Sequence, residues 1–127
     1  MFKHQLLNTQ SGLEVVLVPI DSSPSITTLL LGNTGSRYER LSQQGIAHFF
    51  EHMVFKGSKN YPTAQKLSEA LDSVGAESNA FTSKEYTGYY VKAASVHLPL
   101  ALDVLSDMIL LPKLSPTEIE KEKGVIL

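Results

Sequence analysis

Residues 45–57 read GIAHFFEHMVFKG, and within them His48 and His52 stand four positions apart with Glu51 between them. On a helix, positions i and i+4 lie above one another, so both imidazoles can reach one ion. Neutral imidazole is a preferred zinc ligand, and a catalytic zinc keeps one position open for water. The pattern therefore predicts a zinc site, with Glu51 as the base that takes a proton from a metal-bound water. This order is the H-x-x-E-H motif of the inverzincins.

The same motif has a second interpretation, an amphipathic helix that binds no metal. In that case Phe49, Phe50, Met53 and Val54 face a core, while the histidine and glutamate side chains are solvated. With four histidines in 127 residues, this spacing arises by chance on the order of once in a hundred chains. The rest of the sequence has to decide between the two interpretations.

Length and composition limit the chain to one domain with a buried core, since it has 127 residues, of which 43% are hydrophobic. The net charge is -2 and no basic stripe is present, so nucleic acid is not an expected partner. The absence of cysteine excludes disulfides and thiolate metal sites. We expect a soluble, cytoplasmic protein without a membrane partner, because no signal-peptide core or membrane-spanning apolar run occurs in the sequence.

Hydrophobic periodicity predicts an α+β fold, in which helices cover one face of an antiparallel or mixed sheet. The run Leu29-Leu30-Leu31 predicts a strand that is buried on both faces. Strands are predicted at residues 2–7, 13–18, 25–31, 76–82 and 85–94. Helices are predicted at residues 43–55, from after Pro62 to Gly75, at 96–111, and from 115 onward.

Four segments together resemble one known family. They are GSRYE at 35–39, GIAHFFEHMVFKG at 45–57, NAFTS at 79–83 and LPLALD at 98–103. In this order they resemble the N-terminal part of the pitrilysin or insulinase family of zinc peptidases, especially its bacterial and mitochondrial processing-peptidase branch. The resemblance implies the incomplete first domain of a pitrilysin-like peptidase.

The resemblance also implies roles for individual residues. His48 and His52 would ligate Zn²⁺, and Glu51 would activate the attacking water. The family's third ligand is a glutamate about two helical turns after the position that matches Glu122, which places it beyond Leu127. Glu122 would orient a histidine ligand or support the field at the metal. Residues 1–127 would then be the N-terminal part of the zinc-binding domain, without the third ligand or the second homologous half, and would have little peptidase activity alone.

Substrate handling follows from the same resemblance. Family members bind extended peptides against a sheet edge, here at Asn79 and Ala80, by main-chain pairing. Phe81 either lines a pocket for a substrate side chain or is a core aromatic on a half-buried strand.

The predicted function is that of a zinc endopeptidase, which acts on a peptide substrate together with a second homologous half or subunit. One alternative is a non-catalytic scaffold protein of the same fold, as known among relatives in respiratory and processing complexes. Another alternative is a metal-binding interaction module that associates with further copies of itself through exposed strands. Metal content and solution mass distinguish these alternatives from the enzyme.

Overall fold

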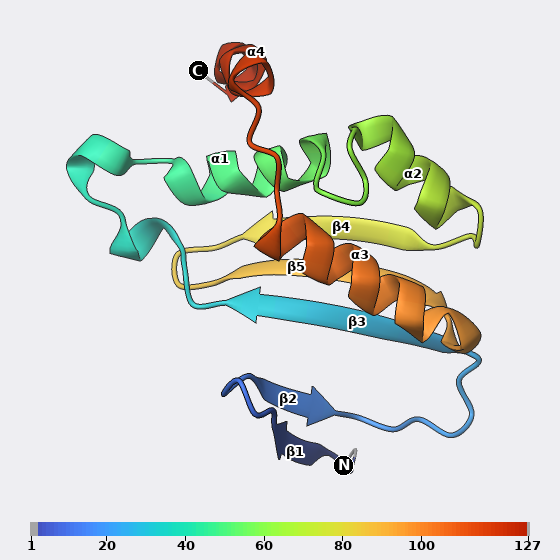
Figure 1. The fold of residues 1–127 in the computed structure, drawn as a ribbon. Coiled ribbons are helices and arrows are strands. Elements are labelled where there is room, and N and C mark those ends of the chain that lie inside the picture. Colours follow the sequence, from blue (N-terminus) through green and yellow to red (C-terminus); the bar gives the residue numbers. More distant parts are fainter. Residues whose placement is uncertain (1–2, 127) are drawn as a thin grey trace.

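The computed structural model describes residues 3–126 and has an α+β fold (Figure 1). The strands are β1 (Gln5–Asn8), β2 (Glu14–Leu17), β3 (Ser25–Gly32), β4 (Glu77–Thr82) and β5 (Thr87–Ala94). The α-helices are α1 (Ile46–Met53), α2 (Ala64–Asp72), α3 (Leu98–Leu110) and α4 (Pro116–Ile126). Short 3₁₀ turns are η1 (Ser36–Tyr38), η2 (Leu41–Gln43), η3 (Val54–Lys56) and η4 (Ser95–His97). The start of the first predicted strand, residue 2, lies outside the described residues.

All strand pairs among residues 3–126 are antiparallel, and they form two separate sheets. One is the β1–β2 hairpin, and the other has the order β3-β5-β4. Strand β5 lies in the centre of the larger sheet and pairs with Thr82 of β4 at Thr87 and with Leu29 of β3 at Tyr90. Strand β4 is consequently an edge strand, and its outer side is free of strand partners in the part of the chain that the structure describes.

A single hydrophobic core joins the helices to one face of the three-stranded sheet, which confirms the predicted arrangement. The core lies between η3, α2 and α3 on one side and β5 on the other. Its buried members are Val54, Leu67, Leu71, Tyr89, Val91, Ala101, Val104, Leu105 and Met108. Helix α4 stands apart from the sheet and packs beside α1 (Figure 1).

The predicted burial of the Leu29-Leu30-Leu31 run on both faces is wrong for residues 3–126. Leu30 packs against the core, but Leu29 is 48% exposed and Leu31 is 59% exposed. The two exposed leucines point to the sheet face opposite the helices, because successive side chains of a strand alternate between faces. An unbroken apolar run is typical of a strand covered on both sides, and this strand is covered on one.

The helix that carries the H-x-x-E-H motif is shorter than the predicted span of residues 43–55. Gln43 belongs to the 3₁₀ turn η2, and the α-helix begins at Ile46 after Gly45, which has a left-handed φ of 86°. After Met53 the chain tightens into η3, which ends at Gly57. The motif itself stays within the regular α-helical part, where the i and i+4 positions are aligned.

None of the helices among residues 3–126 has both the length and the apolar character needed to cross a bilayer.

Candidate metal centre

Helix α1 and the 3₁₀ turn η3 that continues it are bounded by Glu39 contacts at the start and by Gly57 at the end. At its start, the Glu39 carboxylate accepts hydrogen bonds from the backbone N–H of Gly45 at 2.7 Å and of Ala47 at 2.9 Å. These donors have no partner within the helix, and a negative charge there also complements the helix dipole. After η3, Gly57 has a φ of 136°, and a Cβ atom there would lie 2.6 Å from the Pro62 carbonyl oxygen. Glu39 and Gly57 therefore determine where the helical segment that carries the motif begins and ends.

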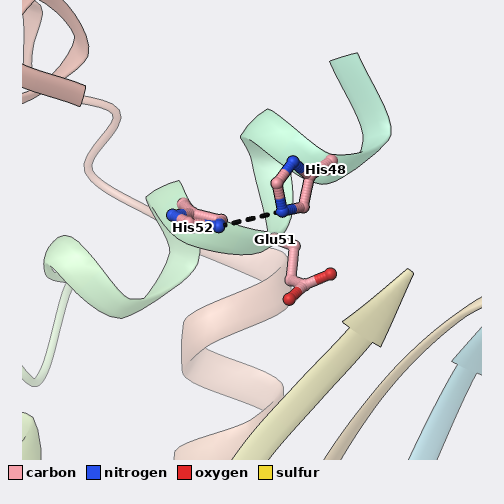
Figure 2. Close-up of side chains that lie close together, drawn as sticks. All are labelled: His48, Glu51 and His52. Carbon is pink, nitrogen blue, oxygen red and sulfur yellow. Dashed lines mark hydrogen bonds between the residues drawn. The ribbon is translucent and has the colours of Figure 1, made fainter. Parts of the chain in front are cut away.

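The side chains of His48, Glu51 and His52 converge, as the motif predicted (Figure 2). The two Nε2 atoms lie 3.1 Å apart, and one possible ligand atom from each of the three residues falls within 4.8 Å of the others. Two imidazole nitrogens on a tetrahedral zinc, each at its usual bond length, stand about 3.3 Å apart. The donor types and their spacing therefore fit zinc.

Glu122 orients His52 from the neighbouring helix α4. The Nδ1 atom of His52 lies 2.7 Å from Oε1 of Glu122, which is 3% exposed. Because an ionised carboxylate only accepts hydrogen bonds, the proton of a neutral His52 ring resides on Nδ1. The lone pair is then on Nε2, the atom that faces His48, and this is the tautomer that a metal requires.

Lys56 completes this contact. Its Nζ atom lies 2.7 Å from Oε2 of Glu122, whereas His52 contacts Oε1 of the same carboxylate. The Lys56 ammonium, followed by His52, holds the pKa of the Glu122 carboxyl below its ordinary value, although burial raises it. Glu122 is therefore an anion at neutral pH, and it links α4 to His52 of α1 and to Lys56 of η3.

Glu51 points from α1 toward the end of strand β4 (Figure 2). There its Oε2 accepts a hydrogen bond from the Thr82 hydroxyl. Burial, and then the charge of Glu51, raise the pKa of the core residue Tyr89 to about 12. The phenol therefore stays protonated at neutral pH, and the carboxylate is the group that can accept a proton here.

The three predicted substrate residues occupy edge strand β4, with their side chains on alternate faces. Ala80 faces the helices and packs against the core. Asn79 and Phe81 are exposed on the opposite face, where the Phe81 ring lies over Gly88 and contacts Tyr86 edge to face. All three residues belong to the same edge strand. The sheet lies between the Phe81 ring and the rings of His48 and His52.

The Glu39 cap leads to a pH-dependent prediction. Backbone N–H groups of Ala47 and then Gly45 lower the pKa of Glu39 below 4.5, so its contribution to stability is present above about pH 4.5 and lost as pH falls through the lower folded-state pKa. Glu39→Gln keeps one acceptor oxygen of the two that the cap uses. We expect this substitution to lower the unfolding temperature at pH 7. The difference in unfolding temperature from the wild type should be smaller at about pH 3.

Thermal unfolding followed by circular dichroism at both pH values tests this cap, with Glu14→Gln, an exposed position on β2, as the control. An equal deficit for Glu39→Gln at both pH values would show that the carboxylate charge does not hold the helix start.

Comparison with known proteins agrees with this geometry. The peptidase family described as "Insulinase (Peptidase family M16)" matches residues 15–127. The chain belongs to the insulinase family of peptidases. The resemblance to this family that four sequence segments indicated is thereby confirmed.

Three relatives show how much of an insulinase-family protein the chain represents. It is 42% identical over 120 residues to "Uncharacterized zinc protease YmxG" of Bacillus subtilis (strain 168), covering 92% of this chain and 28% of that protein. It is 45% identical over 119 residues to human mitochondrial-processing peptidase subunit beta, covering 93% and 24%. It is 39% identical over 123 residues to bovine cytochrome b-c1 complex subunit 1, covering 97% and 25%. The chain thus spans about a quarter of the length of these relatives.

Solved structures confirm the fold class. A protease from Helicobacter pylori matches with a TM-score of 0.92 at 31% identity, over 98% of this chain and 30% of that one. Pitrilysin matches with a TM-score of 0.85 at 33% identity, over 98% of this chain and 13% of that one. The α+β arrangement is therefore that of one part of a pitrilysin-like protease.

Three residues of this insulinase-family site were missed by the sequence analysis, and each had a weak signal. Lys56 follows His52 by four positions, so it continues the helical stripe of His48 and His52. Thr82 lies inside the NAFTS segment, and Glu39 lies inside GSRYE. Their contacts join segments that are far apart or separated by a loop, and local periodicity carries no information about such pairs.

Proposed function

We propose that this insulinase-family chain is the metal-binding part of a zinc endopeptidase that hydrolyses peptide bonds in extended peptides. The observation that carries the proposal is the convergence of His48, Glu51 and His52 within 4.8 Å on one helix. The ring orientation of His52, set by the 2.7 Å contact of its Nδ1 with Glu122, supports it further. Both features are what a zinc peptidase needs from its first two ligands and its base.

Each side chain has a distinct task in this reaction. His48 and His52 would hold the zinc ion, which would lower the pKa of a bound water to about 7 and polarise the scissile carbonyl. Glu51 accepts the proton of the attacking water and then donates it to the leaving amine. Its carboxylate is half-buried and already turned to one side of the helix by Thr82, so little reorganisation is required.

The substrate would bind along the outer edge of β4, next to Asn79 and Ala80. The N–H and C=O groups on this side have no strand partner among residues 3–126. Pairing there selects an extended conformation rather than a particular sequence, and leaves side-chain preference to pockets, one of which Phe81 would line. The relatives are about four times longer, and we infer that comparable additional length supplies a third metal ligand and a second homologous half or subunit.

A non-catalytic assembly subunit is the second candidate function. The 39% identity to a subunit of the bovine cytochrome b-c1 complex favours it. Against it stands the intact and convergent H-x-x-E-H group of this chain. A structural subunit has no need for zinc, whereas the peptidase does.

Zinc analysis separates the two functions. We expect a version of the chain lengthened to the size of its relatives to purify with about one zinc per chain and to hydrolyse an unstructured peptide. The 127-residue chain should bind zinc more weakly, because two imidazoles leave the ion short of protein ligands. The measurements are elemental analysis and peptide cleavage followed by mass spectrometry. A longer version with intact His48, Glu51 and His52 that takes up no zinc and cuts no peptide would refute the peptidase.

A further inference from the structure

The Thr82 hydroxyl, on strand β4, forms a hydrogen bond with the Glu51 carboxylate. Thr82 is the last residue of β4, and its hydroxyl donates a hydrogen bond to Oε2 of Glu51. No hydrogen bond to Oε1 is found among residues 3–126, so Oε1 is the less engaged of the two oxygens and the freer one to accept a proton from water. The contact connects β4 of the sheet with α1, over a sequence separation of 31 residues.

The position of this hydroxyl is well determined by the structure around it. Thr82 pairs across the ladder with Thr87, which is 1% exposed and whose own hydroxyl donates to the Thr34 carbonyl at 3.0 Å. The following turn is closed by the Ser83 N–H, which donates to the Tyr86 carbonyl at 2.9 Å. A β-branched side chain on a paired strand also has few rotamers. Holding Glu51 through Thr82 therefore costs little additional conformational entropy.

We propose that Thr82 is a positioning residue, which holds the Glu51 carboxylate in the orientation for proton transfer and links it to the strand edge that binds the peptide. The inference rests on the proposed function, and it adds a residue to which neither the motif nor the comparisons assign a role. Thr82 is the last residue of β4, the strand that contains Asn79 and Ala80. One rigid strand would therefore set both the register of the peptide and the orientation of the Glu51 carboxylate. Preorganisation of this kind acts on the transition state more than on substrate binding.

A double-mutant cycle in the 127-residue chain tests the contact without requiring activity. Thr82→Val removes the hydroxyl but keeps the shape and the strand preference of the side chain. We expect it to lower the unfolding midpoint in urea when Glu51 is present, and to have no further effect in the Glu51→Ala background. Strictly additive effects of the two substitutions would overturn the proposal, whether or not any version of the protein is a peptidase.

Kinetics of the lengthened version test the role itself. Loss of a hydrogen bond to a charged group should lower kcat of Thr82→Val by about 10- to 100-fold, with KM and zinc content unchanged. Thr82→Ser retains the hydroxyl and should keep kcat within a few-fold of wild type. Thr27→Val, at an exposed position of β3, is the matched control for removal of a strand hydroxyl.

The outcomes separate this inference from the proposed function. If the wild type hydrolyses peptide and kcat of Thr82→Val stays within about twofold of it, Thr82 does not position the base. A parallel rise in KM, or a loss of zinc, would assign Thr82 a merely structural role and would also overturn the inference. If the wild type itself is inactive, the proposed function fails, and the double-mutant cycle still decides whether Thr82 holds Glu51.

Discussion

Glu51→Gln is expected to lower kcat for peptide hydrolysis by about 10²- to 10⁴-fold, in a version of the chain lengthened to the size of its relatives. Glutamine has the shape of glutamate and can still accept from the Thr82 hydroxyl, but it cannot take a proton from the attacking water. The zinc content should not change, because the imidazoles of His48 and His52 remain in place. The defect would therefore lie in kcat, with KM near the wild-type value.

Glu69→Gln provides the matched control for this substitution. Glu69 lies on α2 in an exposed ion pair with Lys66, and it belongs to neither the metal group nor the core. Initial rates at several peptide concentrations, measured beside elemental analysis of the same samples, give kcat, KM and zinc content. If Glu51→Gln keeps its zinc and its kcat falls less than about tenfold, another group must accept the proton.

The centre of this site was predictable from the sequence because its geometry is local. His48, Glu51 and His52 lie within one and a half turns of a single helix, so their spacing alone brings them together once the segment is helical. The strand and helix order was equally readable, since periodicities of two and 3.6 residues report which face is buried. The predicted β4 and β5 therefore needed only small changes at their ends.

The features that sequence reasoning missed depend on contacts that the hydrophobic pattern does not report. The start of α1 is set by Gly45 with a positive φ and by a carboxylate six residues before it, whereas the amphipathic pattern extends to Gln43. The double burial predicted for the run at Leu29 and Leu31 would need a layer on the second face of the sheet. Residues 3–126 put no such layer over these two leucines.

Glu122 shows where a family resemblance adds to periodicity. Helix α4 carries Glu118, Glu120 and Glu122 in a short stretch, and charge pattern alone predicts a solvated face for all of them. The structure buries Glu122 and turns it toward His52 and Lys56, while Glu118 and Glu120 pair with lysines on their own helix. The contact that distinguishes Glu122 spans 70 residues, and no local pattern reports it.

Glu122→Ala is expected to weaken zinc binding by about 10- to 100-fold. The substitution removes the acceptor that holds the His52 Nδ1 proton, so the ring is free to rotate and to adopt the wrong tautomer. It also leaves the Lys56 ammonium, formerly paired at 2.7 Å, as an uncompensated positive charge near the metal. Both effects act on the metal affinity, so the loss should appear in the zinc dissociation constant even where no peptide is present.

A graded series distinguishes this orienting role from general damage to helix α4. Glu122→Gln keeps an oxygen that can accept from Nδ1, so its zinc affinity should fall less than that of Glu122→Ala. Glu120→Ala removes an exposed carboxylate from the same helix and should leave the affinity at the wild-type value. Competition with a chromophoric chelator measures the dissociation constants, and circular dichroism checks that each variant is folded. If Glu120→Ala and Glu122→Ala weaken zinc binding equally, helix α4 acts through its overall negative charge, and the contact with His52 has no special part in holding the metal.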